Sequence, residues 1–187
     1  MNYTILMKNS FFYFIAILFL VSCVKPTPRK PVTQKTSSFM KESVSINKKI
    51  IELEEEAIKD VIKKDSLSNY TNSANGFWYK YNVQSNESYL PQIGDQLFYT
   101  CEIADLNNTI IYSSDELGIQ KYIVDKQELP EGLRNGLKLM KVGDNVTFLF
   151  PSHKIYGYLG DNNKIGINQP LIYNVQLNKI NKQNEIN

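Results

Sequence analysis

The sequence has few of the side chains on which most metal and nucleophile sites depend. Its 187 residues include one histidine, His153, and two cysteines, Cys23 and Cys101. One histidine cannot form a histidine-based metal cluster, and there is no glycine-rich phosphate loop or nucleophile elbow. The formal net charge is only +2, which gives no electrostatic sign of nucleic-acid binding. The sequence therefore predicts no metal, no cofactor and no nucleic-acid partner.

Long apolar runs are also scarce, and the one at the N-terminus is short. Phe11–Val21 is an almost unbroken apolar run of 11 residues that follows Lys8. A membrane-spanning helix needs about 20 such residues, whereas a shorter run suits the core of a secretory signal peptide. Leu20-Val21-Ser22-Cys23 then resembles the lipobox of bacterial lipoproteins. We predict that residues 1–22 are a lipoprotein signal peptide and that Cys23 carries the lipid. The alternative is an uncleaved anchor helix with an incidental cysteine.

The next part of the chain changes from a tether-like composition to a helical pattern. Residues 23–40 contain three prolines and few large apolar side chains, which predicts a flexible tether behind the lipidated cysteine. Between Ile46 and Ile62, apolar residues recur at spacings of three and four, with lysine and glutamate in the gaps. This pattern predicts an amphipathic helix, within a segment 41–75 that ends in a polar linker. The apolar face packs on its own domain or, alternatively, contacts a partner or a second copy of the chain.

From residue 76 onward the pattern has the period of two that is typical of β-strands. We predict strands at 76–81, 96–103, 109–112, 145–150 and 171–178, the last being the clearest. Pro130 can begin a short helix between them. One helix across an antiparallel sheet is an α+β arrangement, which we assign to residues 76–180, followed by a polar tail at 181–187. Cys101 lies in a predicted strand, where it is expected to be a small core residue.

Three blocks of this region resemble FKBP-type peptidyl-prolyl cis-trans isomerases. They are residues 129–143 (LPEGLRNGLKLMKVG), 150–157 (FPSHKIYG) and 167–177 (INQPLIYNVQL). The resemblance covers about 105 of the 187 residues. It implies an FKBP-like antiparallel sheet wrapped around one short helix, preceded by the amphipathic N-terminal helix. The lipobox, that helix and Gly76-Phe77-Trp78-Tyr79 together resemble the gliding-motility-associated lipoprotein branch of the family.

The resemblance also implies a site for a proline ring. Tyr156 takes the position of the family's hydroxyl donor and is the expected catalytic residue, while Leu133 takes the pocket floor. The other expected substrate-binding residues are Leu129, Pro130, Ile111, Tyr112, Tyr122, Ile165 and Tyr173. Leu133 replaces the usual tryptophan, and Tyr112 replaces the usual pocket aspartate. The family's aromatic residue on the second strand aligns with Cys101, and Tyr99 can substitute for it after a two-residue change of register.

By this resemblance the chain is a peptidyl-prolyl cis-trans isomerase that assists the folding of exported envelope proteins, including those of a gliding machinery. Its partners are then proline-containing polypeptides and, through the lipid on Cys23, a membrane. The expected location is the outer membrane, with the domain facing the periplasm. The alternative function is a catalytically weak FKBP-like binding module or chaperone that acts as a scaffold. The Tyr112 replacement favours this alternative, whereas the retained Tyr156-Gly157 favours the enzyme.

Overall fold

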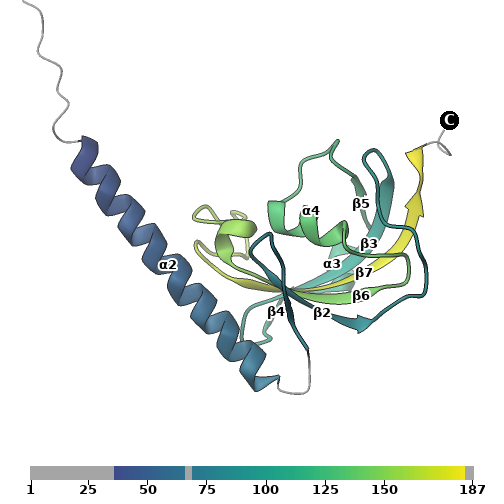
Figure 1. Cartoon of the computed structure of the whole chain (residues 1–187), viewed down its shortest axis with the longest axis horizontal. Helices are drawn as coiled ribbons and strands as arrows, with labels where there is room; N and C mark the ends of the chain where they lie inside the picture. The colour runs from purple at the N-terminus through teal and green to yellow at the C-terminus, as the bar shows by residue number, and fades with distance from the viewer. Residues whose placement is uncertain (1–35, 66–68, 184–187) are drawn as a thin grey trace, which may run out of the picture. The chain divides into compact units, whose positions relative to one another are not determined.

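A computed structural model describes residues 36–65 and 69–183 (Figure 1). The helices are α2 (Thr36–Lys64), α3 (Ser114–Leu117), α4 (Glu131–Leu137) and the 3-10 helix η2 (Ser152–Lys154). The strands are β1 (Thr71–Asn72), β2 (Trp78–Val83), β3 (Gln96–Ala104), β4 (Ile110–Tyr112), β5 (Gln120–Ile123), β6 (Asn145–Phe150) and β7 (Leu171–Asn181).

The chain divides into two units, residues 1–40 and residues 41–187. Of the first unit, only residues 36–40, at the beginning of α2, are described. The predicted signal peptide and Cys23 therefore lie outside the described residues. Within the described ranges, no helix is long and apolar enough to cross a membrane.

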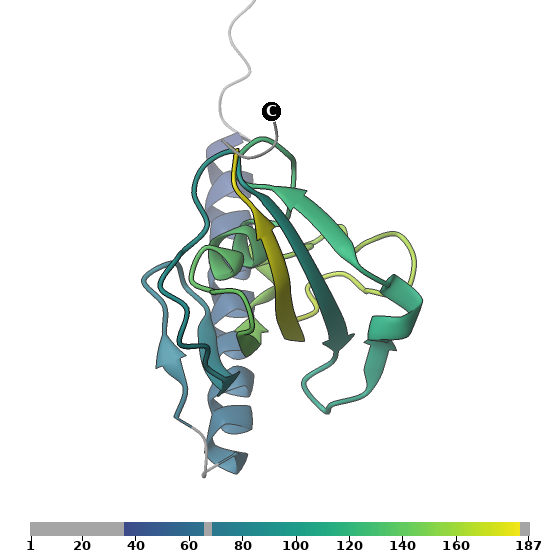
Figure 2. The same ribbon diagram turned by 90° about the vertical axis from the view of Figure 1, so that its right-hand side faces the viewer.

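The strands form one antiparallel sheet in the order β1-β2-β6-β7-β3-β4, with β5 also paired to β3. Strand β7 is central because it pairs with both β3 and β6, and Figure 2 shows β7 and β3 side by side. The predicted α+β class, with an antiparallel sheet and one short helix, is confirmed. Strand β5 is not predicted by the sequence pattern; it pairs with the first half of β3.

Helix α4 packs on the inner face of the sheet, where the main core lies (Figure 1). Its residues Leu133 and Leu137 are buried in this core. Two glycines allow the close approach. A Cβ at Gly132 would lie 2.7 Å from the Phe150 ring, and one at Gly136 would lie 2.9 Å from the Phe148 ring. Any larger side chain would push α4 away from the aromatic residues of β6.

Helix α2 contributes to a second, smaller core on the outer face of the sheet. Ile58 is fully buried there against Ala104, Leu149 and Ile172. Ile172 is therefore buried although it lies on the other side of β7 from the main core. The interpretation that the helix packs on its own domain holds for this part of α2. Leu53, in contrast, remains 57% exposed.

One boundary of the sequence prediction is corrected. Helix α2 begins at Thr36, so residues 36–40 are helical, although composition alone places them in the tether at 23–40. The last proline before the helix is Pro31. Every residue from 32 to 64 therefore has the backbone N–H that a helix needs for its hydrogen bonds. The helix therefore begins closer to the proline-rich segment than the apolar spacing alone indicates.

Candidate functional site

Two hydrogen-bonded tyrosines lie at the centre of the predicted site. Tyr173 on β7 is buried, while Tyr156, which follows η2, is half-buried against the same core. Burial first, and then the nearby Tyr156 and the hydrogen bond with it, raises the pKa of Tyr173 above its usual value. A tyrosine hydroxyl can both donate and accept a hydrogen bond, so the Tyr156 hydroxyl can donate to a substrate while it lies next to Tyr173.

Apolar side chains from several parts of the chain lie in the same core cluster as this pair. Leu133 of α4 and Ile165 of the segment before β7 are buried, and Leu129 is half-buried against them. Pro130 is the residue before α4 and is half-buried. The structure therefore brings eight of the nine predicted residues into one cluster, with Pro130 next to them: Ile111, Tyr112, Tyr122, Leu129, Leu133, Tyr156, Ile165 and Tyr173.

Tyr122 contributes its ring to this cluster, while its hydroxyl has a local role. It lies on β5 and is 1% exposed. Its hydroxyl accepts a hydrogen bond from the backbone N–H of Asp125 at 3.0 Å. The polar end of this side chain is thereby engaged in the turn after β5.

A carboxyl group lies beside Tyr112, the residue that replaces the family's usual pocket aspartate. The Tyr112 hydroxyl donates to Oδ2 of Asp161 at 2.6 Å. Oδ1 of Asp161 accepts hydrogen bonds from the N–H groups of Asn163 and Ile165, both at 2.8 Å. Burial opposes the ionisation of Asp161, but the hydrogen bond from Tyr112 and those from the backbone hold its pKa below the usual value. The sequence analysis did not predict Asp161, because this residue lies between the family-like blocks 150–157 and 167–177.

Strand β3 supplies Tyr99 to the same cluster. Tyr99 and Cys101 are both buried on the inner face. Burial, with nearby Cys101, Tyr156 and Tyr122, raises the pKa of Tyr99. Burial also raises the pKa of the Cys101 thiol to about 11. Cys101 is therefore a protonated core residue, as expected, and Tyr99 is the aromatic residue that this strand directs toward Tyr156.

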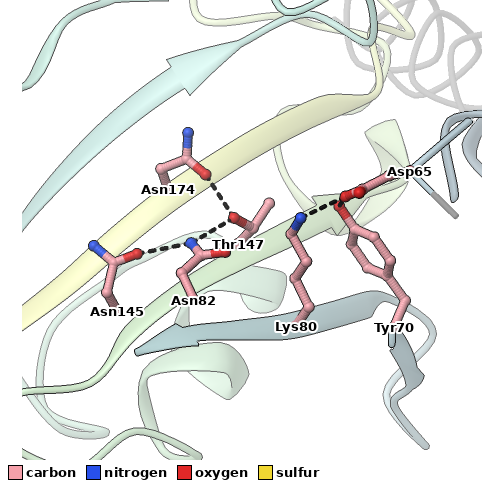
Figure 3. Close-up of polar contacts among 7 residues, drawn as sticks. All are labelled: Asp65, Tyr70, Lys80, Asn82, Asn145, Thr147 and Asn174. Carbon is pink, nitrogen blue, oxygen red and sulfur yellow. Dashed lines mark hydrogen bonds and ion pairs between the residues drawn. The ribbon is translucent and has the colours of Figure 1, made fainter. Parts of the chain in front are cut away.

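A separate hollow lies on the outer face of the sheet, next to the end of α2. Its volume is about 420 Å³, and its lining includes Asp65, Tyr70, Lys80, Thr147 and Asn174. As Figure 3 shows, Lys80 and the Tyr70 hydroxyl bond to Asp65. The Thr147 hydroxyl donates to Asn174 at 2.7 Å.

Because these polar groups bond one another, this surface is best explained as the junction between α2 and the sheet. In the described part of the chain, every buried side-chain nitrogen or oxygen has a hydrogen-bond partner. Within the same residues, no cluster of three or more His, Cys, Asp or Glu side chains is placed to hold a metal ion. We therefore place the candidate site at the tyrosine and leucine cluster on the inner face.

Comparison with known proteins shows which family this part of the chain resembles. Residues 88–178 match the family model described as "FKBP-type peptidyl-prolyl cis-trans isomerase". This part of the chain is an FKBP-type peptidyl-prolyl isomerase domain. The chain is also 32% identical, over 128 residues, to the "Probable FKBP-type peptidyl-prolyl cis-trans isomerase FkpA" of Neisseria meningitidis. That match covers 68% of this chain and 43% of the relative, so the chain matches less than half of the relative's length.

A solved structure supports the fold of the FKBP-type domain. It is a peptidyl-prolyl cis-trans isomerase from Pseudomonas syringae pv. tomato, which matches with a TM-score of 0.60 at 16% identity. The match covers 72% of this chain and 96% of that one. All nine predicted site residues lie within the family match at 88–178, whereas α2, β1 and β2 precede it.

Proposed function

We propose that this chain catalyses cis-trans isomerisation of X–Pro bonds in polypeptides. The observation that carries the proposal is the position of Tyr156, a hydroxyl donor that is half-buried beside Tyr173 against an apolar cluster. Leu133 and Ile165 provide apolar contact for a proline ring, and Tyr156 donates a hydrogen bond to the substrate. The family match at 88–178 supports the same reaction.

The chemistry requires no acid, base or metal. Rotation about a peptide bond is opposed by a barrier of about 18–20 kcal/mol because resonance is lost, and X–Pro bonds exchange over tens to hundreds of seconds. A site that binds the twisted amide better than either planar form lowers this barrier. A thousandfold acceleration needs about 4 kcal/mol. One neutral hydrogen bond supplies about 0.5–1.5 kcal/mol, so the apolar walls have to supply much of the remainder.

A binding module with weak turnover is the second candidate. Leu133 gives a smaller floor than the usual tryptophan, and Pro130 has no backbone N–H to offer a substrate carbonyl. A full-length sample would be added at catalytic amounts to a Leu-Pro peptide, and cis-trans exchange followed by NMR. Faster exchange supports the isomerase. Peptide-induced shifts at Tyr156 or Tyr173 without faster exchange favour the binding module. If the peptide causes no shifts and its exchange is not faster, both candidate functions are contradicted.

We propose in addition that the domain is lipid-anchored through Cys23 in the bacterial envelope. The support is the sequence Leu20-Val21-Ser22-Cys23 behind an apolar run of 11 residues. On this proposal residues 1–22 are removed and the domain works from the outer membrane toward the periplasm. Cys23→Ala should abolish incorporation of radiolabelled palmitate. Labelling that persists in this variant would rule out Cys23 as the lipid site.

The clients we propose are exported envelope proteins, including those of a gliding machinery. The support is the combined resemblance of the lipobox, the Glu/Lys-rich helix and Gly76-Phe77-Trp78-Tyr79 to the gliding-associated branch. Exposed apolar side chains on α2 support a partner or dimer contact as well: Val44, Ile46 and Leu53 are 65%, 53% and 57% exposed. Sedimentation of the full chain and of Ile46→Lys distinguishes a dimer from a monomer with a free face.

A further inference from the structure

A buried contact joins helix α2 to the segment that carries Tyr156. Glu54 of α2 is only 6% exposed. Its Oε2 accepts a hydrogen bond from the backbone N–H of Ser152 at 2.8 Å, and its Oε1 accepts one from the Ser152 hydroxyl at 2.7 Å. Both oxygens of one carboxyl group thus contact one residue that lies 98 positions later in the chain. Such a two-point contact sets orientation as well as distance.

Ser152 in turn organises the backbone around Tyr156. It is the first residue of η2, and its carbonyl oxygen accepts hydrogen bonds from the N–H groups of Ile155 at 2.9 Å and Gly157 at 2.8 Å. Tyr156 lies between these two donors. A displacement of Ser152 therefore moves the Tyr156 side chain relative to Tyr173.

Helix α4 holds the same segment from another direction. Nζ of Lys154 lies 2.9 Å from Oε1 of Glu131, the first residue of α4. The approach is so close that a Cβ at Gly132 would be 3.0 Å from the carbonyl oxygen of Lys154. On this side, an ion pair and backbone packing fix the segment together.

On the α2 side, packing is less complete. A hollow of about 260 Å³ lies between α2, where Asn47, Ile50 and Ile51 line it, and the segment that carries Tyr156, where Ser152, His153 and Tyr158 line it. Protein interiors normally fill such space with side chains, which then restrain one another. Because the space is open here, the two hydrogen bonds to Glu54 carry much of the attachment between α2 and this segment.

We infer that Glu54 is a positioning residue for Tyr156, acting through Ser152. It follows that α2, which lies outside the family match at 88–178, supports the isomerase site as well as the outer core. The inference rests on the proposed function, because it takes Tyr156 as the donor to the substrate. Glu54→Gln keeps only one acceptor oxygen, so one of the two buried Ser152 donors loses its acceptor and η2 has to shift until it finds another.

The first test compares Glu54→Gln with Glu56→Gln, an exposed position on the same helix. A misplacement of about 1 Å can lower a rate about a hundredfold. Because Glu54 acts through the Tyr156 hydroxyl, we expect Glu54→Gln to lower kcat/KM about two- to fivefold, mainly through kcat, and by no more than Tyr156→Phe does. Glu56→Gln should stay within about twofold of wild type, as expected for an exposed position. An unchanged kcat/KM in Glu54→Gln would overturn the inference.

A double-mutant cycle separates positioning from general stability. If Glu54 acts through the Tyr156 hydroxyl, Glu54→Gln should cost less than about twofold in a Tyr156→Phe background. The change in melting temperature caused by Glu54→Gln should be the same in both backgrounds. An equal loss of kcat/KM in both backgrounds would show a general structural effect and would overturn the positioning role.

A readout that does not depend on turnover keeps this claim separate from the proposed function. In protein with ¹³C-labelled tyrosine, Tyr156→Phe assigns the Tyr156 ring resonance. We expect that resonance to move in Glu54→Gln and to stay in place in Glu56→Gln. Absence of turnover in wild type would contradict the proposed function, and the Tyr156 resonance would still decide the positioning claim. A resonance that stays in place in Glu54→Gln overturns it.

Discussion

The Tyr112 hydroxyl donates to the Asp161 carboxyl group across 2.6 Å. The contact connects β4 to the loop that leads to Ile165, because the same carboxyl group accepts the backbone N–H of Ile165. Asn163 adds a further hydrogen bond from its side chain to the Tyr112 hydroxyl at 2.9 Å. Ile165 is thus held by a polar network of Tyr112, Asp161 and Asn163 as well as by packing in the apolar cluster.

Asp161→Asn should make the segment that contains Ile165 more mobile. The amide keeps the shape of the side chain but weakens its hydrogen bonds to Tyr112 and to the backbone, because bonds to an ionised acceptor are the stronger ones. We expect faster hydrogen exchange at Ile165 and a drop in kcat/KM of several-fold. Asp115→Asn, an exposed position on α3, is the matched control. Unchanged exchange at Ile165 would show that packing alone fixes this segment.

The same carboxyl group predicts a sensitivity to acid. Its pKa in the folded state lies below the ordinary value of 3.8, so the folded protein binds fewer protons at this site than the unfolded chain. The contribution of Asp161 to stability is therefore present above the unfolded pKa, and it is lost as the pH falls through the folded pKa. The urea midpoint of wild type should fall more steeply below about pH 4 than that of Asp161→Asn. Parallel curves would contradict the role of Asp161.

The small outer core should make a measurable contribution to stability. Ile58 is fully buried, whereas Leu53 on the same helix is 57% exposed. Ile58→Ala should lower the free energy of unfolding by about 2–5 kcal/mol. Leu53→Ala should change it by less than about 0.5 kcal/mol. Urea denaturation measures both, and similar losses for the two variants would mean that α2 does not pack as described.

Cys101 should be unreactive in the folded protein. Burial raises the pKa of its thiol to about 11, and only the thiolate reacts quickly with disulfide reagents. With Cys23 replaced by alanine, we expect slow labelling of the native protein at pH 8 and rapid labelling in urea. Rapid labelling of the native protein would show that β3 opens, and it would place Cys101 outside the core.

The spacing of apolar residues is enough to predict β7 and α2, since it records which faces of these elements are apolar. It cannot predict that Ile172 is buried, because its burial depends on α2 covering the other face of the sheet. Strand β5 is short, and its pairing with β3 depends on the path of the chain between them. Where two distant segments meet, local spacing contains no information about the contact.

The residues of the candidate site fall into two groups: those that sequence motifs predict, and those whose contacts only the fold reveals. Leu133 and Tyr156 lie in motifs, so the resemblance to the isomerase family is enough to locate them. Asp161 and Glu54 are two of the 19 acidic residues of the chain, and each meets a partner distant in sequence. Asp161 and Tyr112 are 49 positions apart, and Glu54 and Ser152 are 98 positions apart. These residues come into contact only in the folded structure, so the sequence alone does not reveal the pairs.

The central claim is that the Tyr156 hydroxyl stabilises a twisted prolyl bond above the Leu133 floor. Isomerisation of a Leu-Pro peptide, followed with a coupled protease, tests it in wild type, Tyr156→Phe and Leu133→Asp, with folding checked by circular dichroism. The exposed Tyr158→Phe is the control, since Tyr158 is 74% exposed. Removing one neutral hydrogen bond should slow Tyr156→Phe about two- to tenfold. A charge in the apolar floor should abolish activity in folded Leu133→Asp, and Tyr158→Phe should match wild type. Equal rates in all four proteins would contradict the account, because the reaction would then take place away from this cluster.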